Sequence, residues 1–143
     1  MLATIQWSGL GDGRSWADIN NWVGGALPGA QDDAVIDIAS NPTVVFSSGA
    51  TTVKSLTVGD SFSITGGSFI VTGNSAVTGD FSLTGGSLTA TGSGAQFLAS
   101  GSTTVVGASL FATAGATLSL PNLTSYTNTT STNDQTRTFQ ATG

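Results

Sequence analysis

Residues 61–73 read SFSITGGSFIVTG and residues 80–92 read DFSLTGGSLTATG, so the second stretch repeats the first. A looser copy, TTVVGASLFAT, follows at 103–113, and a fourth, TFQATG, begins at residue 138. Self-similarity at a period of about 20 residues is typical of a solenoid in which each repeat forms one turn. Leucine-rich repeats share this length, but the chain lacks their regular Leu and Asn pattern.

Each copy contains a short stretch in which apolar and polar residues alternate, as in a strand with one buried face. We expect Phe69 and Val71 to point inward, with the corresponding Leu and Ala residues of the later copies. The Gly pairs at 66–67 and 85–86 recur at the same place in successive copies, where the chain must bend sharply. The pattern therefore predicts an all-β protein, a parallel β-helix with about 19–22 residues per turn.

Stacking of such turns would place like residues above one another on the outside of the solenoid. The expected exterior column consists of threonines: Thr72, Thr91, Thr113 and Thr142. A β-sandwich of short strands is the alternative fold, but a sandwich gives no reason for the Gly pair to recur at a fixed offset.

The composition fits stacked turns. Only 8% of the 143 residues are charged, against about 25% in an ordinary domain. In a solenoid, equivalent positions lie about 4.8 Å apart, so a repeated charge would repel its neighbours while Ser and Thr hydroxyls can hydrogen-bond along the stack.

Three basic residues and a net charge of −5 argue against nucleic acid or anionic membrane surfaces as partners. No apolar run approaches the length of a membrane span, and the absence of Cys excludes disulfides.

The chain divides near residue 40. All three tryptophans, Trp7, Trp16 and Trp22, and five of the eight aspartates lie before that point. We interpret residues 1–40 as an N-terminal cap or joint and residues 41–143 as solenoid repeats with an excursion loop near 125–137. The tryptophans are expected to cover the open end of the apolar core. The alternative is that they form an aromatic platform for sugars.

The N-terminal motifs resemble a known family. They are IQWSG at 5–9, SWAD at 15–18, NNW at 20–22, LPGA at 27–30 and DDAVID at 32–37, followed by VKSLTV at 53–58 and ATLSLPNLT at 116–124. These motifs resemble those of bacterial surface proteins with autotransporter-associated β-strand repeats. The resemblance implies a secreted, passenger-like parallel β-helix, located at the cell surface or outside the cell, with a structural or adhesive role. It carries no catalytic residues over to this chain.

The aspartates are the remaining candidates for chemistry. Asp12, Asp18, Asp32 and Asp33 are weak candidates for binding calcium, and turn-forming, solvent-facing roles are the alternative. Catalysis by paired acids needs a carboxyl group whose pKa is raised by burial or by a neighbouring charge, and nothing in the sequence indicates either. The chain also contains no His. We therefore predict a protein that is not an enzyme and has no catalytic residues, and whose one candidate cofactor is the calcium that these aspartates would bind.

The fourth repeat stops at Gly143, which would leave a stack of unpaired strand edges. Either further solenoid turns follow, or the open end contacts another copy and builds a filament. The predicted function is that of an extracellular structural or adhesive β-solenoid in a cell-surface or matrix fibre. Its expected partners are copies of itself, further turns or surface glycans. The alternative is a carbohydrate-binding module, or a carbohydrate-cleaving one, that uses Asp12, Asp18, Asp32 and the tryptophans.

Overall fold

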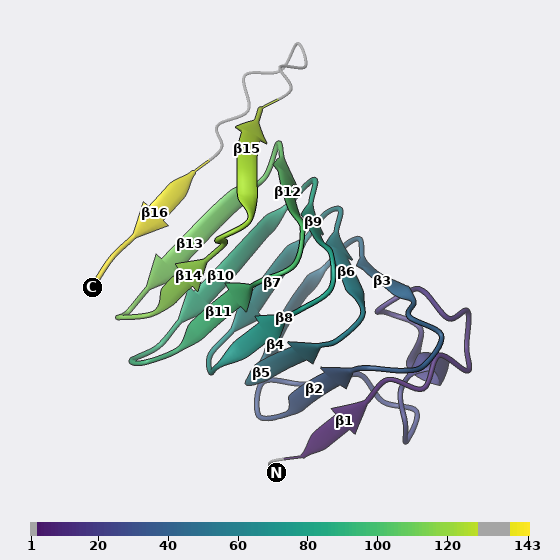
Figure 1. Ribbon diagram of the computed structural model, residues 1–143. Coiled ribbons are helices and arrows are strands. Elements are labelled where there is room, and N and C mark those ends of the chain that lie inside the picture. Colours follow the sequence, from purple (N-terminus) through teal and green to yellow (C-terminus); the bar gives the residue numbers. More distant parts are fainter. Residues whose placement is uncertain (1–2, 129–137) are drawn as a thin grey trace.

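The computed structural model, which describes residues 3–128 and 138–143, is a parallel β-solenoid of about five turns (Figure 1). Three parallel sheets run along it. The first sheet contains β1 (Thr4–Gln6), β2 (Asp33–Ile36), β5 (Ser55–Val58), β8 (Ser75–Val77), β11 (Gln96–Ala99) and β14 (Thr117–Ser119). The second contains β3 (Thr43–Phe46), β6 (Ser61–Ile64), β9 (Phe81–Leu83), β12 (Thr103–Val106) and β15 (Leu123–Thr127). The third contains β4 (Ala50–Val53), β7 (Ser68–Val71), β10 (Ser87–Thr91), β13 (Ser109–Thr113) and β16 (Phe139–Ala141).

The register of the strands follows the sequence repeat. Leu88 of β10 pairs with Phe69 of β7 in the turn before it and with Leu110 of β13 in the turn after it. All three side chains are buried, as the alternation predicts. The predicted parallel β-helix is therefore confirmed, and the β-sandwich alternative is wrong.

The core is a continuous apolar column inside the three sheets. Successive turns place aromatic rings above one another, and the rings of Phe62 and Phe81 stack with their centroids 6.4 Å apart and 12° between their planes. Phe97 of the following turn lies 5.3 Å from Phe81 between ring centroids. Burial of these rings is the main stabilising contribution in a fold whose turns contact only their neighbours.

The repeated Gly pair lies at the corner between the second and third sheets. Gly67 has φ = 80° and Gly86 has φ = 69°, a backbone conformation that residues with a Cβ rarely adopt. A Cβ at Gly67 would also lie 2.5 Å from the carbonyl oxygen of Gly49 in the turn before it. The N–H of Ser87 donates to the carbonyl oxygen of Gly67 at 2.9 Å. Glycine is thus required both by the bend and by the close approach of successive turns.

Two details of the structure concern the segments expected from the sequence. The segment before residue 40 is not separate from the solenoid, because β1 and β2 form one end of the first sheet. Of the loop expected near 125–137, residues 125–127 belong to β15, and residues 129–137 lie outside the described part of the chain. The strand that follows returns to the stack, where Phe139 pairs with Leu110.

The described ranges contain one short helix, the 3-10 turn η1 (Ile19–Asn21). No helix in those ranges is long and apolar enough to cross a membrane.

Candidate functional site

The three tryptophans lie inside the molecule. Trp7, Trp16 and Trp22 are only 3%, 1% and 2% exposed. The ring of Trp22 lies between the other two in edge-on contacts, with centroids 5.0 Å from Trp7 and 4.7 Å from Trp16. Its indole N–H donates to the carbonyl oxygen of Trp16 at 2.9 Å. Rings buried in this way cannot offer an exposed stacking surface to a sugar.

Trp16 joins this cluster to the solenoid core. Its ring makes edge-on contacts with Phe46 of the first turn and with Phe62 and Phe69 of the second, at centroid distances of 6.4, 6.0 and 5.1 Å. The three tryptophans, which we call the tryptophan cluster, therefore continue the apolar column at the N-terminal end of the stack. This is the position that a cap would occupy.

The backbone of the N-terminal segment also covers strand edges. β1 pairs with β2, and a short bridge joins Ser15 to Val45 of β3. In that bridge the N–H of Trp16 donates to the carbonyl oxygen of Val45 at 2.9 Å, and the N–H of Val45 donates to the carbonyl oxygen of Arg14 at 2.8 Å. The first turn is thereby extended by strand-like pairing in the first and second sheets. Figure 1 shows this segment lying across the end of the stack near β2 and β3.

A hydrogen-bonded loop built on Asn21 supports the tryptophan cluster. The Asn21 side chain is fully buried, and its Oδ1 accepts hydrogen bonds from the N–H groups of Gly11 and Gly13 at 3.0 and 2.9 Å. Its Nδ2 donates to Asp12 Oδ1 at 2.8 Å and to the carbonyl oxygen of Ser15 at 3.0 Å. One amide side chain thus satisfies four hydrogen-bond partners within this loop.

Asp12 is held in the same loop as a hydrogen-bond acceptor. Its Oδ1 accepts from the N–H groups of Arg14 and Ser15 at 2.8 and 2.7 Å. Hydrogen bonds from the side chain and main chain of Ser15, and then from Asn21 and Arg14, hold the pKa of Asp12 well below its usual range because they favour the charged carboxylate. Asp12 is therefore a charged carboxylate that stabilises this turn by accepting hydrogen bonds.

The other calcium candidates also accept hydrogen bonds within their own segments. Asp18 caps η1, with Oδ1 accepting from the N–H of Asn20 at 3.0 Å, while its Oδ2 accepts from the N–H of Asp12 at 2.9 Å. Asp32 Oδ2 accepts from the N–H of Gly29 at 2.8 Å. The structure brings Asp12 and Asp18 together but does not join Asp32 and Asp33 to them. In the part of the chain that is described, no three carboxylates gather in a group that could hold a metal ion.

Asp33 takes part in a contact on the outside of the first sheet. Its Oδ1 accepts a hydrogen bond from the Ser55 hydroxyl at 2.6 Å, and its Oδ2 lies 3.8 Å from Lys54 Nζ. Both charged side chains are partly exposed, so this ion pair contributes little to stability.

The threonines of the expected exterior column lie along the third sheet. Thr91 and Thr113 pair in register, and the Thr113 hydroxyl donates to that of Thr91 at 2.9 Å. The N–H of Thr142 donates to the carbonyl oxygen of Ala112 at 2.8 Å, and that of Thr72 to Val53 at 3.2 Å. The hydroxyl contact joins two turns without introducing charge.

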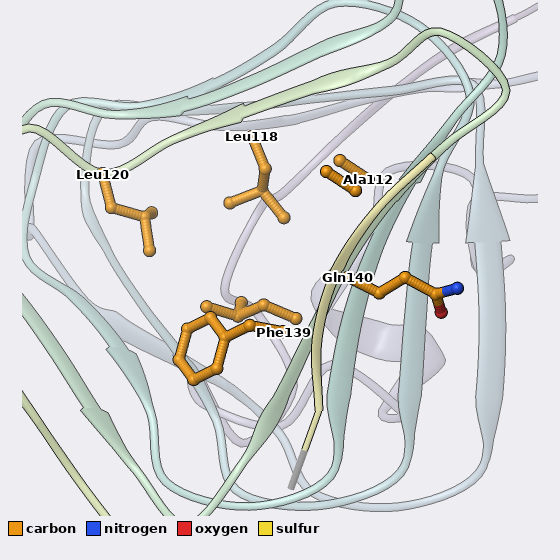
Figure 2. A pocket seen from close by; sticks show the side chains of 7 residues that line it. Ala112, Leu118, Leu120, Phe139 and Gln140 are labelled. Carbon is orange, nitrogen blue, oxygen red and sulfur yellow. The ribbon is translucent and has the colours of Figure 1, made fainter. Parts of the chain in front are cut away.

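The C-terminal end of the stack is hollow. A cavity of about 320 Å³ lies there, lined by Leu110, Ala112, Leu118, Leu120, Phe139, Gln140 and Ala141. In Figure 2 the side chains of Leu118, Leu120 and Phe139 surround the hollow, while the amide of Gln140 points away from it. Phe139 is 54% exposed, although its ring contacts Tyr126 with centroids 4.5 Å apart. The apolar column therefore reaches the surface at this end.

Sequence reasoning did not find this cavity or the buried polar side chains. The incomplete fourth repeat indicated an open end, but which apolar residues surround the hollow depends on how β13 of one turn meets β14 and β16 of the next. In the sequence, Asn21 is only part of the NNW motif at 20–22, and nothing there indicates a buried side chain. Asp60 is 3% exposed, and its Oδ2 accepts from the N–H of Ile38 at 3.0 Å. The sequence shows this residue only as one Asp beside a Gly in a corner.

The fold defines the class of protein, which is that of the parallel β-solenoids. No protein-family model matches the chain, and no curated protein or solved structure matches it at a significant level.

Proposed function

We propose that this protein is an extracellular structural or adhesive β-solenoid that contributes to a cell-surface or matrix fibre. The single observation that carries the proposal is the stack of about five turns, whose strands pair in register apart from an irregularity between Thr103 and Val105, where β12 pairs with β15. Such a stack extends by adding equivalent strands to its end, because each turn needs only its neighbours. End-to-end assembly of copies is the form of fibre that this geometry favours.

The surface chemistry supports a scaffold. Outward positions of the third sheet are mainly Ser and Thr, as in Ser68, Ser87 and Ser109, which pair in register. This surface allows equivalent positions to stack without repulsion between like charges. The resemblance of the N-terminal motifs to autotransporter-associated β-strand repeats supports the extracellular location and the structural or adhesive role.

The position of the tryptophans removes the main argument for the carbohydrate-binding alternative. The rings of the tryptophan cluster are buried, and Asp12 and Asp18 accept hydrogen bonds from the loop that surrounds them. A sugar would have to be recognised by another surface, such as the outer face of a sheet. A glycan array probed with the purified chain tests this alternative, and specific binding would favour it over a purely structural role.

Two measurements test the proposed function. Treatment of intact source cells with a protease that cannot enter them should remove the protein if it lies outside the cell, and an intracellular control protein should survive. Negative-stain electron microscopy of the purified chain should show elongated particles longer than one solenoid at high concentration. A protein that is protected in intact cells would contradict the extracellular assignment, and single solenoids at every concentration would contradict self-assembly.

A further inference from the structure

Two aspartates of successive turns lie at the corner that leads from the first sheet to the second. Asp37 directly follows β2 in the first turn, and Asp60 follows β5 in the second. We propose that Asp37 and Asp60 form a calcium site that links these two turns. This inference goes beyond the proposed function, because it depends neither on assembly nor on where the protein is located.

The first argument is a buried carboxylate oxygen. Asp60 is 3% exposed, and its Oδ1 has no hydrogen-bond partner among the described residues. Its Oδ2 accepts a hydrogen bond from the N–H of Ile38, in the turn before it, at 3.0 Å. Burial of a charged oxygen without a partner is costly, so such an oxygen indicates a bound group that carries positive charge.

The second argument is the position of Asp37, the residue before Ile38. A Cβ at Gly59 would lie 2.9 Å from both Cγ and Oδ1 of Asp37, so this carboxylate occupies the space that a side chain at residue 59 would fill. The φ angle of Gly59 is not positive, so space rather than a bend explains the glycine. Asp37 thus lies over the residue before Asp60, while Asp60 reaches the residue after Asp37. Both carboxylates therefore lie in the gap between the same two turns.

The third argument is the lack of a basic partner. Among the described residues, the ion pair is that of Lys54 with Asp33, on the outside of the first sheet. Arg14 forms no ion pair in that part of the chain, and Arg137 lies outside it. Two carboxylates that no described basic residue neutralises match the charge of one divalent cation.

The acidic pair occurs at one level of the stack. The register of β5 and β8 places Gly79 beside Asp60 in the next turn, and a Cβ at Gly79 would meet the carbonyl oxygen of Asp60. Gly101 follows Gly79 in the same way. The column therefore avoids a repeated carboxylate, and the two acids meet only between the first and second turns.

The donor set favours calcium. Carboxylate oxygens suit calcium and magnesium rather than softer transition metals. Calcium accepts irregular coordination and takes water and main-chain oxygens beside carboxylates, whereas magnesium requires near-ideal octahedral geometry. With only two acidic ligands, the expected dissociation constant is on the order of 0.1–1 mM, as in extracellular calcium-binding modules.

Thermal unfolding of the full chain in EDTA and in calcium tests the inference. About 10 mM calcium should raise the melting temperature by about 3–8 °C, since it would exceed the dissociation constant by roughly 10- to 100-fold. The same concentration of magnesium should have a smaller effect. Asp60→Asn keeps the shape of the side chain and an oxygen for the N–H of Ile38, but it should lose most of the calcium shift. Asp37 is exposed, so Asp37→Asn tests the site without altering a buried group and should lose the shift as well.

Matched variants provide the controls. Asp80→Asn removes an exposed carboxylate at the corresponding corner of the next turn, and Asp12→Asn removes one from the loop that covers the tryptophan cluster. Both should keep the full calcium shift. Circular dichroism of every variant in EDTA separates a loss of binding from a loss of folding.

Terbium, which replaces calcium at oxygen sites, gives a second readout. Ile38 lies beside Trp7, because a Cβ at Gly9 would be 3.2 Å from Ile38 Cδ1 and 3.3 Å from Trp7 Nε1. Excitation of tryptophan should therefore produce terbium emission that added calcium suppresses. Asp60→Asn should abolish this emission, and Asp12→Asn should retain it.

Two results would overturn the inference. A melting temperature that calcium leaves unchanged would show that the corner does not bind the ion. A calcium shift that survives both Asp37→Asn and Asp60→Asn, or that Asp12→Asn abolishes, would place the ion elsewhere. Neither result affects the protease or microscopy experiments, so failure of the calcium site and failure of the proposed function are distinguishable.

Discussion

The two ends of the solenoid finish the same stack of strands in opposite ways. At the N-terminal end, the tryptophan cluster packs against Phe46, Phe62 and Phe69, and a loop held by Asn21 lies over it. At the C-terminal end, the core opens into a cavity beside the half-exposed ring of Phe139. The repeat itself is similar at both ends, so the difference comes from the segment that is added to it.

This comparison shows what a solenoid needs beyond its repeats. A turn in the middle of the stack is covered on both sides, whereas a terminal turn exposes apolar side chains and strand edges unless something covers them. The N-terminal segment covers both, with aromatic rings for the core and short strand pairings for the edges. At the C-terminal end, the described residues leave both exposed.

The largest effect is expected at the N-terminal end, from Trp16→Ala. This ring contacts three phenylalanines of two turns as well as Trp22, and its removal should lower the free energy of unfolding by about 3–5 kcal/mol. Urea unfolding followed by circular dichroism measures the loss. Trp16→Phe keeps an aromatic ring and should lose only about 1–2 kcal/mol, since the indole N–H of Trp16 has no hydrogen-bond partner among the described residues. Equal losses in the two variants would contradict the packing role of the ring.

The next effect tests the loop that covers this cluster. Asn21→Ala removes four hydrogen bonds of a fully buried amide and should cost about 2–4 kcal/mol. Its neighbour Asn20 is exposed, and Asn20→Ala should change stability by no more than about 0.5 kcal/mol. Thermal and urea unfolding of the pair measure the difference. If both substitutions cost the same, the loop does not depend on the buried amide.

A smaller effect is expected at the open end. Phe139→Ala should cost only about 1 kcal/mol when measured in dilute, monomeric protein, because its ring is half exposed before the substitution. Phe81→Ala provides the matched control, since that ring is buried in the middle of the stack and its removal should cost about 3–5 kcal/mol. A large loss from Phe139→Ala in the monomer would mean that the C-terminal end is covered by its own chain.

The smallest effect depends on pH. The folded protein holds the pKa of Asp12 below its ordinary value of 3.8, first through the hydrogen bonds from Ser15. The stabilisation from Asp12 is therefore complete above about pH 4 and is lost as the pH falls from there toward the folded pKa, because the unfolded chain binds the proton more readily. Asp12→Asn should melt at a lower temperature than the wild type at neutral pH, and this difference in melting temperature should narrow below about pH 4. Asp80→Asn, at an exposed corner, serves as the control and should melt like the wild type. A gap that stays constant down to low pH would contradict this account.

Much of the solenoid could be predicted from residues close together in the sequence. The alternation around Phe69 and Leu88 identified the buried face, and the recurring Gly pair located a corner at which the backbone requires positive φ. The candidate site was less accessible. The same Trp and Asp residues fit an exposed sugar platform, a calcium site or a cap, because their spacing in the chain does not specify which way the segment folds back.

By itself, the sequence determined the class of fold, the length of the turn and the residues that point inward. These follow from alternation and from periodic repetition, which act between neighbouring residues and between one turn and the next. Only the tertiary structure decided that the turns form three sheets, that Ser15 pairs with Val45 of a later segment, and that one end is covered while the other is open. Those outcomes depend on contacts between segments that are distant in the sequence. Many arrangements of such segments compete, and they differ in packing and hydrogen bonding rather than in any local sequence pattern.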